Sequence, residues 1–241
     1  MKNFKTISLL ILVLAITVTA CKKEEKESNS NLPITPKCLV KSISTSTGIL
    51  HDYVYDNANN FLSLTIKNGS SEFTYNYTYL TNSVKIGNNE TYNLNSFGLA
   101  ESSDHIVPDG EMHFIYQYDN QNQIISAIGN GEANGKPSTL KSFYEYSNGN
   151  MVKSTTESST STFGVRTYEY YLDKLNPFKK TLERKTFKNA NTNLVKAEYL
   201  DGKLSVTYSY EFDEKGNVTK KTETYSKGYE FFETYTWDCP N

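Results

Sequence analysis

The sequence predicts an all-β fold, a curved antiparallel meander of repeated hairpins that can close into a soluble barrel-like sheet. After residue 38, apolar and polar residues alternate with period two, helical periodicity is almost absent, and turn residues separate the alternating runs. Aromatic residues make up 13% of the 241 positions, with 19 Tyr and 12 Phe, whereas Cys, Gly and Pro are scarce. This composition argues against a disordered, collagen-like or disulfide-dense chain.

Residues 1–20 have the composition of a secretory signal peptide. Two Lys and no acid in the first six residues precede the apolar run 7–20, which is too short to span a hydrocarbon core of ~30 Å. The run ends in Val18-Thr-Ala-Cys21, which resembles the bacterial lipobox. By that resemblance Cys21 is the lipidation site and becomes the first residue of the mature chain, held at the membrane by its acyl chains. A plain signal peptide with a cysteine nearby is the alternative.

Residues 21–37 have the composition of a flexible tether. They carry Lys and Glu directly after the cysteine, then Ser, Asn and Pro, and they hold little that could be buried. The Lys-Lys-Glu-Glu of residues 22–25 also resembles the acidic export signal of Bacteroidetes-type surface lipoproteins, although a solubilising tether explains the same charges. We therefore expect a lipid-anchored protein of the outer membrane that is exposed at the cell surface, or alternatively faces the periplasm.

Charge and cysteine content restrict the partners and the compartment. The formal net charge is -2, so the chain has no basic excess with which to bind phosphate backbones, and no nucleic-acid partner is expected. Once Cys21 is lipidated, only Cys38 and Cys239 remain, one at each end of the predicted domain. Outside the cytoplasm two such thiols tend to pair, which makes Cys38 and Cys239 a candidate disulfide. Two separately buried thiols are the alternative.

Residues 38–241 form a single all-β domain in this prediction. Alternation over 62–66, 73–79, 204–212 and 229–237 predicts strands with one buried and one solvent-facing side. Residues that accept the positive φ of tight hairpin turns lie between such runs: Asn68-Gly69, Asp109-Gly110, Asn148-Gly149, Asp201-Gly202, Lys215-Gly216-Asn217 and Lys227-Gly228. Neighbouring strands should therefore pair antiparallel.

One short element recurs, several times at a spacing close to 25 residues. An aromatic-x-aromatic strand end is followed by Asp or a similar polar residue and then by Gly or Asn. The side chain of the Asp is expected to fold back onto the turn backbone while the Gly or Asn takes the left-handed conformation. The copies begin at Tyr53, Tyr116, Tyr144 and Tyr210, with less complete versions at Tyr92 and Tyr235, and they explain as turn residues Asp56, Asp119, Asp213 and Asp238.

This element is similar to the tyrosine-aspartate (YD-type) repeats of large bacterial shell proteins. The opening Cys38-Leu-Val-Lys-Ser-Ile, the segment 171–178 and the terminal Trp237-Asp-Cys239 extend the resemblance to Bacteroidetes lipoproteins of unknown function with a porin-like fold. The resemblance covers about residues 38–239, and the chain departs from the ideal repeat at 79–82 and at Ser147. It implies a curved antiparallel meander that can close as a barrel, and it implies no known activity.

A barrel that spans the membrane would need strands of about ten residues with a continuous lipid-facing apolar band. Here the aromatic residues alternate with Thr, Ser, Asn, Glu and Lys, so only one side of each strand is apolar. We therefore expect a sheet wrapped around an aromatic core. In one register that core would contain Tyr53, Tyr55, Tyr75, Tyr77, Tyr116, Tyr118, Tyr208 and Tyr210.

The chain carries no recognisable catalytic or metal-binding spacing. His51, His105 and His113 lie in no metal-ligand motif, and nucleophile-elbow, P-loop and dinucleotide signatures are absent. No catalytic residue, metal or cofactor is therefore predicted. We expect a non-enzymatic module that binds a glycan or an envelope protein. The alternative is an envelope hydrolase whose carboxylates come together only in the fold.

Two aromatic pairs interrupt the strict alternation. In Tyr170-Tyr171 and Phe231-Phe232 the neighbouring rings would lie on opposite sides of a regular strand, so one ring of each pair is expected to face outward. Aromatic side chains with a polar tip are favoured at binding surfaces. The candidate exposed contact residues are therefore Tyr170, Tyr171, Phe231 and Phe232.

Overall fold

The computed structural model describes residues 38–107, 109–133, 135–159, 162–180 and 191–239. The predicted signal peptide, Cys21 and the tether lie outside these ranges. The described residues form sixteen strands and one short 3-10 helix. In chain order they are β1 (Leu39–Thr45), β2 (Leu50–Tyr55), β3 (Phe61–Asn68), β4 (Ser71–Tyr79), β5 (Ser83–Ile86), β6 (Glu90–Leu94), β7 (Ala100–Val107), β8 (Gly110–Tyr118), β9 (Ile124–Ala133), β10 (Lys136–Ser147), β11 (Asn150–Ser158), β12 (Thr162–Leu175), η1 (Pro177–Lys180), β13 (Asn193–Leu200), β14 (Lys203–Phe212), β15 (Val218–Tyr225) and β16 (Glu230–Asp238).

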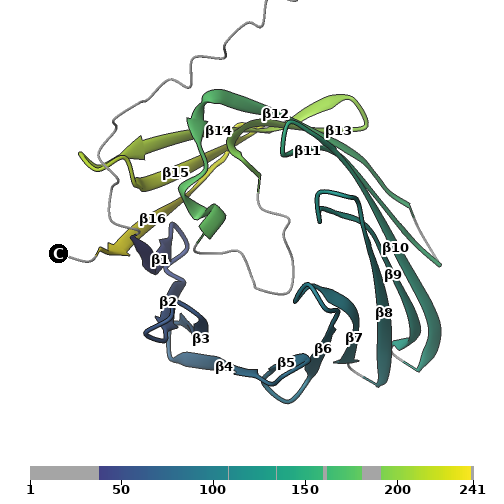
Figure 1. The fold of residues 1–241 in the computed structure, drawn as a ribbon. Coiled ribbons are helices and arrows are strands. Elements are labelled where there is room, and N and C mark those ends of the chain that lie inside the picture. The colour runs from purple at the N-terminus through teal and green to yellow at the C-terminus, as the bar shows by residue number, and fades with distance from the viewer. Residues whose placement is uncertain (1–37, 108, 134, 160–161, 181–190, 240–241) are drawn as a thin grey trace, which may run out of the picture. The chain divides into compact units, whose positions relative to one another are not determined.

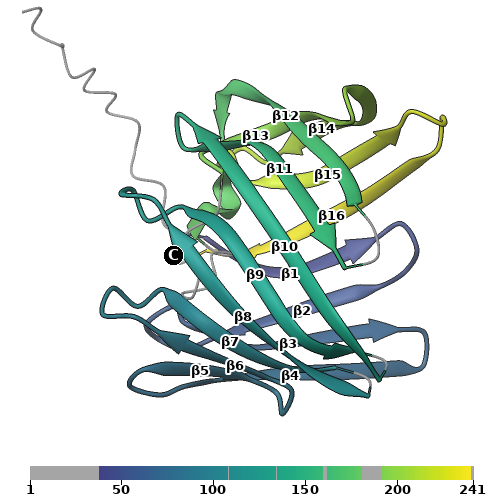
Figure 2. The same ribbon diagram turned by 90° about the vertical axis from the view of Figure 1, so that its right-hand side faces the viewer.

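The strands form one closed antiparallel barrel. Each strand pairs with the next one in the chain, and β1 pairs with β16 to complete the ring (Figure 1). Figure 2 shows the same strands from the side, tilted across the barrel wall. Closure leaves none of the sixteen described strands at an open edge of the sheet. The predicted all-β meander is confirmed, and the sheet closes.

The seam between the first and last strands runs from the pair Leu39–Asp238 to the pair Thr45–Glu233. Cys38 immediately precedes Leu39, Cys239 immediately follows Asp238, and their sulfur atoms are bonded at 1.99 Å. The disulfide thus joins the two ends of the barrel wall at the point where the ring is closed.

Asp and Asn side chains organise four of the turns at the barrel end where this seam disulfide lies. Between β8 and β9, Oδ1 of Asp119 accepts hydrogen bonds from the backbone N–H groups of Gln121 and Gln123, both at 2.8 Å. Asn122 in the same turn has a φ of 62°, in the left-handed region. Asp56 and Asp213 accept the same pair of backbone bonds in their own turns, and Asn95 does so between β6 and β7. These residues are turn residues, as the repeat predicts, whereas Asp238 lies in β16.

A β-bulge precedes each of these turns. The strand register shifts at the residue just before Asp56, Asn95, Asp119 and Asp213, and again between Glu145 and Tyr146. Bulges strengthen the local twist, which helps a sheet to curve into a barrel. The recurring sequence element is therefore a bulge followed by an Asx turn.

At five points of the barrel, an aromatic side chain is hydrogen-bonded to the backbone of the preceding hairpin. The Tyr118 hydroxyl donates to the carbonyl oxygen of Ala100 at 2.7 Å, and the indole N–H of Trp237 donates to that of Val218 at 2.7 Å. Tyr79, Tyr170 and Tyr210 make equivalent bonds to backbone carbonyls. Each of these rings buries its body against the wall and satisfies its polar atom on the backbone.

Replacing Asp119 with alanine is expected to lower the free energy of unfolding by about 1 kcal/mol, by analogy with loss of a capping side chain. The two backbone N–H groups that Asp119 binds would lose their acceptor. Urea unfolding followed by circular dichroism measures the change. The exposed Glu101 on β7 provides the control, because its replacement by alanine removes a carboxylate outside any turn. Equal effects of the two substitutions would contradict the turn role.

The apolar core lies toward the barrel end that carries the Asx turns. One cluster of buried residues contains Val40, Ile43, Leu194, Val218 and Tyr235, and Tyr53, Tyr171, Tyr210, Trp237 and Phe178 of η1 pack against it. A second cluster contains Tyr77, Val84, Ile86, Tyr92 and Ala100. Tyr75, another expected core residue, is 43% exposed. The inside of the barrel is therefore not filled uniformly by its own rings.

The outer side of β14–β16 is polar. Strand register places on it Thr207, Ser209, Glu211, Lys220, Thr222, Thr224, Thr234, Thr236 and the one apolar side chain of this set, Phe232. Over these three strands the wall lacks the continuous apolar band of a lipid-facing barrel.

Candidate functional site

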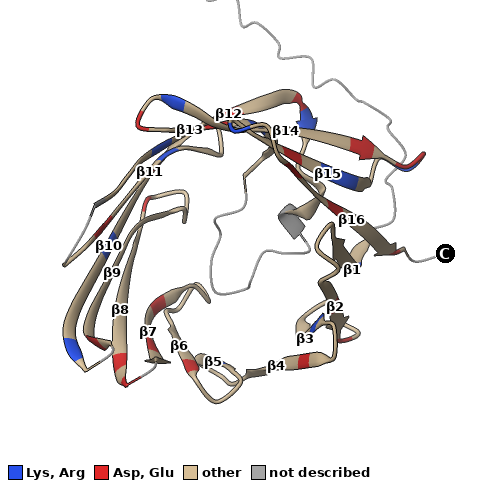
Figure 3. Ribbon diagram, turned by 180° about the vertical axis from the view of Figure 1, so that it is seen from behind, with Lys and Arg blue, Asp and Glu red and all other residues tan. Residues whose placement is uncertain are grey.

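Charged residues occur on strands all around the barrel (Figure 3), so their function depends on which side of the wall they face. On β14–β16 the register pairs Tyr210 with Lys221 and Lys221 with Glu233, which places all three side chains on one side. Glu233 alternates with Tyr235, which is buried in the core. These charges therefore face the inside of the barrel, called the lumen below.

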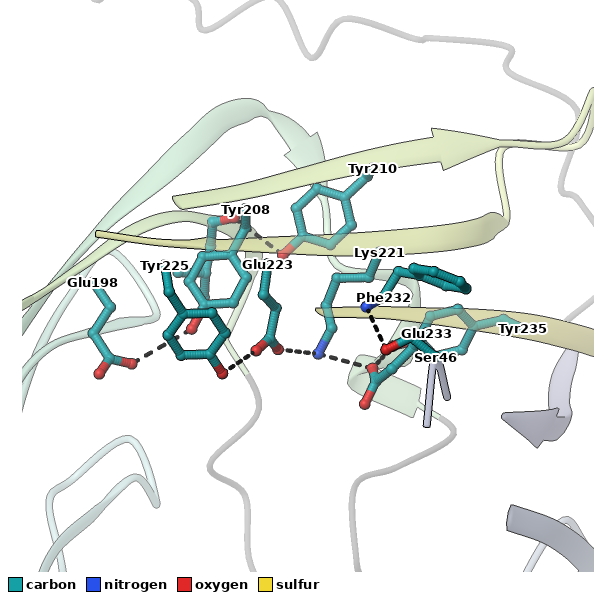
Figure 4. A network of polar contacts seen from close by, with 11 residues as sticks. Ser46, Glu198, Tyr208, Tyr210, Lys221, Glu223, Tyr225, Phe232, Glu233 and Tyr235 are labelled. Atoms are coloured by element: carbon teal, nitrogen blue, oxygen red, sulfur yellow. Dashed lines mark hydrogen bonds and ion pairs between the residues drawn. The ribbon is translucent and has the colours of Figure 1, made fainter. Parts of the chain in front are cut away.

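A network of polar side chains runs along this part of the lumen wall (Figure 4). Lys221 Nζ lies 2.9 Å from Glu223 Oε1 and 2.8 Å from Glu233 Oε2. The three side chains are only 14–20% exposed. The hydroxyl of Tyr225 donates to Glu223 at 2.8 Å, and that of Tyr235 donates to Glu233. One cation and two phenol donors thus orient two mostly buried carboxylates, and the group keeps a net negative charge.

The protonation states follow from these contacts. Burial lowers the pKa of Lys221, but the facing Glu233 and Glu223 more than offset this effect, so its pKa is raised. The hydrogen bond to Glu223, with burial and the carboxylate charge, raises the pKa of Tyr225 to about 12. Burial, followed by the charge of Glu233, raises the pKa of Tyr235. At neutral pH Lys221 is therefore charged and both tyrosines remain hydrogen-bond donors.

A second ion pair extends the network toward β12. Nη1 of Arg166 donates to Oε1 of Glu198, whose side chain is 11% exposed. The hydroxyl of Tyr208 lies 3.5 Å from the other oxygen of Glu198. The lumen wall formed by β13–β16 thus presents three carboxylates, Glu198, Glu223 and Glu233.

The adjoining part of the lumen wall, on β7–β12, is hollowed by two pockets. One has a volume of about 640 Å³ and is lined by His105, Val107, Met112, Phe114, Ala133, Lys136, Pro137, Ser138, Thr139, Leu140, Ser158 and Ser159. The other, of about 340 Å³, is lined by Leu140, Ser154, Thr156, Phe163, Gly164 and Arg166. Leu140 belongs to both, so the pockets adjoin, and together these residues are called the β7–β12 wall.

Small residues on β9 make this hollow possible. The register pairs Gly131 with Met112, Gly129 with Phe114 and Ala127 with Tyr116. A Cβ atom added to Gly129 would lie 2.4 Å from Cε1 of Phe114, so the phenyl ring lies directly on the β9 backbone. A larger residue at this position would push the ring into the lumen.

A hydrogen-bonded chain fixes His105 at the edge of the larger pocket. The Oγ of Ser103 lies 2.7 Å from Nε2 of His105 and 2.7 Å from the Tyr116 hydroxyl. Nδ1 of His105 is 4.0 Å from Glu90 Oε2. Ser103 itself is completely buried. The order serine, histidine, carboxylate is that of a nucleophilic triad, but here the serine is enclosed.

The site residues predicted from the sequence do not lie together in the structure. Cys21 lies outside the described residues, and Cys38 and Cys239 form the seam disulfide. Phe232 faces outward, 40% exposed, with Lys220 Nζ 5.3 Å from its ring centre, whereas Phe231 is half-buried opposite Glu223.

For Tyr170 and Tyr171, the expectation that one of the two rings faces outward is wrong. The Tyr170 hydroxyl donates to the Met151 carbonyl at 2.6 Å, and the Tyr171 hydroxyl donates to that of Tyr208 at 2.9 Å. The register between β12 and β13 shifts on both sides of the pair, which breaks the alternation that would have separated the two rings. Both rings are half-buried, and neither is an exposed contact.

Sequence reasoning missed the charged residues of the lumen. Glu233 alternates with aromatic residues on their own side of β16, and Lys221, Glu223 and Tyr225 occupy every second position of β15. This period-two pattern was the available signal. It does not reveal the lumen by itself, because Lys and Glu are expected on the solvent side of a strand.

Within the described ranges, no group of three or more His, Cys, Asp or Glu side chains is placed to hold a metal ion. In the same part of the chain, no helix is both long enough and apolar enough to cross a membrane.

No family model and no curated protein matches the sequence. The fold is similar to that of two solved structures. A porin-like protein from Bacteroides uniformis ATCC 8492 matches with a TM-score of 0.64 and 17% identity, over 83% of this chain and 98% of that chain. A porin-like protein from Bacteroides vulgatus ATCC 8482 matches with a TM-score of 0.59 and 14% identity, over 83% of this chain and 99% of that chain. The chain therefore has the barrel fold of these porin-like proteins.

Proposed function

We propose that this chain is a lipid-anchored protein of the bacterial cell envelope whose barrel binds a glycan in its lumen and does not transform it. Acylation of Cys21 would supply the anchor, as the lipobox-like residues 18–21 suggest. The tether would hold the barrel at the outer membrane, at the cell surface or facing the periplasm. An envelope protein is the second class of partner that such a module could bind.

The observation that carries this proposal is the pair of adjoining pockets on the β7–β12 wall. Their volumes, about 640 and 340 Å³, lie in the range of small-molecule sites. The rings of Phe114 and Phe163 offer apolar surfaces, and Ser138, Ser154 and Thr156 offer hydroxyl groups close to them. Aromatic faces beside hydrogen-bonding groups suit a sugar ring, which has both apolar and hydroxyl-bearing surfaces.

The arrangement of the acids favours binding over hydrolysis. Lys221 is paired with both Glu223 and Glu233, and Arg166 is paired with Glu198. Each of these carboxylates is thus engaged by a cation, whereas hydrolysis of a glycoside needs two carboxyl groups placed on either side of the glycosidic bond.

An envelope hydrolase is the second candidate, because of the contact between Ser103 and His105. In that function Ser103 Oγ would attack an acyl group and His105 would accept its proton. The burial of Ser103 and its further bond to Tyr116 favour a structural role instead.

Binding and turnover can be tested on the chain from residue 21 carrying Cys21→Ser, which removes the acylation site. We expect this protein to bind at least one envelope or host oligosaccharide on a glycan array and in calorimetry, with no product by mass spectrometry. Gly129→Val should weaken that binding at least tenfold, because the added side chain would displace the Phe114 ring into the larger pocket. Ile128→Val, at the neighbouring outward-facing position of the same strand, is the matched control.

Two results would contradict the proposal. Failure to bind any saccharide, with the fold intact, would remove the glycan function. Release of product that is lost in Ser103→Ala would favour the hydrolase.

A further inference from the structure

We infer that the ligand of the β7–β12 wall is an acidic oligosaccharide, whose carboxylate groups are bound by Lys136 and Arg166. This inference rests on the proposed glycan binding and adds the charge of the ligand. It follows from the unequal distribution of acids and bases around the lumen.

The charged side chains that line the two pockets are all basic. The described linings of the two pockets contain Lys136, Arg166 and His105 and no Asp or Glu. This local basic character stands out because the chain as a whole has more acids than bases, 27 against 25. A concave surface lined by one sign of charge attracts ligands of the opposite sign.

The two cations, Lys136 and Arg166, lie in different pockets. Lys136 begins β10 and lines the larger pocket, whereas Arg166 on β12 lines the smaller one. A ligand that crosses from one pocket to the other past Leu140 would therefore meet a cation in each. An oligosaccharide that repeats its carboxylate from residue to residue satisfies this arrangement, whereas an amphiphile with a single acidic head group satisfies one cation only.

Arg166 has hydrogen-bond donors to spare for a ligand. Its guanidinium group carries five N–H donors, and Nη1 donates to Glu198. The planar fork of Arg suits a carboxylate, and Glu198 orients it in the lumen. The hydroxyls of Ser154 and Thr156 line the same pocket and can bind the sugar hydroxyls.

The part of the lumen wall on β15 and β16 carries acids. Glu223 and Glu233 face the lumen from β15 and β16, so an anion is disfavoured there and favoured near Lys136 on the β7–β12 wall. Such unlike charges on two parts of the lumen wall fix the orientation of a charged ligand more than its affinity.

Calorimetry on the same chain, with Cys21→Ser, can test this inference with three probes. These are an oligogalacturonate of four residues, its fully methyl-esterified form, and laurate. We expect the acidic oligomer to bind at least tenfold more tightly than the ester, which has the same rings without charge. Raising sodium chloride from 50 to 500 mM should remove most of that difference, because salt screens exposed charges.

Lys136→Gln should weaken binding of the acidic oligomer about tenfold and leave binding of the ester unchanged. Lys141→Gln is the matched control, because Lys141 lies on the same strand, is also exposed and faces outward opposite Glu157. Both lysines are exposed, so neither substitution is expected to disturb the fold. Arg166→Gln gives a second measurement, in which circular dichroism reports whether loss of the Glu198 partner has altered the barrel.

The outcomes separate this inference from the proposed function. If the ester binds as tightly as the acid, or if Lys136→Gln has no more effect than Lys141→Gln, the inference is wrong and glycan binding stands. If laurate binds while neither saccharide does, and a glycan array also gives no ligand, both are wrong.

Discussion

Removing the seam disulfide is expected to lower the free energy of unfolding by an amount on the order of 5 kcal/mol, an upper value for the chain-entropy model. Cys38 and Cys239 are 201 residues apart, so the bond restricts almost the entire unfolded barrel. The double substitution Cys38→Ser and Cys239→Ser, in a Cys21→Ser background, can be compared with the same background by urea unfolding.

Thiol labelling provides the control for this comparison. The Cys21→Ser protein, unfolded without a reductant, should show no free thiol, and it should show two after reduction. Two free thiols before reduction would contradict the pairing, and an unchanged midpoint in the double variant would contradict its effect on stability.

Replacing Lys221 with methionine is expected to lower the free energy of unfolding by about 3–5 kcal/mol, the range for removing one partner of a buried ion pair. The substitution leaves Glu223 and Glu233 in the lumen without their shared cation. Lys220→Met is the matched control, because the neighbouring lysine faces outward and pairs with the exposed Glu211. Its loss should change stability by less than about 1 kcal/mol.

The effect of Lys221 should also depend on pH. Its pKa is raised in the folded protein, so its ion pairs stabilise the barrel fully below the pKa of an unfolded lysine, about 10.4. That stabilisation is lost as the pH rises through the raised pKa of the folded state. Equal urea midpoints for the Lys221 variant and the parent at pH 7 would show that the pairs contribute no net stability.

The strands and turns were predictable because each depends on neighbours in the sequence. The alternation of residues 204–212 requires only that one side of a strand be buried, and Asp119 binds backbone groups two and four residues further on. Neither feature depends on the rest of the barrel.

The candidate site was not predictable to the same degree, because it depends on contacts between distant strands. Glu198 faces the lumen from β13 and finds its partner Arg166 on β12, 32 residues earlier. The inward position of Tyr170 and Tyr171 depends on register shifts between those same strands. Alternation within one strand assigns a residue to a side, but only the closed ring determines that the aromatic side also contains charges.

Closure of the ring also has a consequence for how the chain reaches its native state. Every pairing except that of β1 with β16 joins strands that are consecutive in the sequence, so most of the wall can assemble by fast, local hairpin formation. The last pairing must bring Leu39 next to Asp238, and it bears nearly all of the entropy of long-range loop closure. The seam is therefore where we expect folding to be slowest and the native barrel to open first, and a bond between Cys38 and Cys239 would act on that kinetic step.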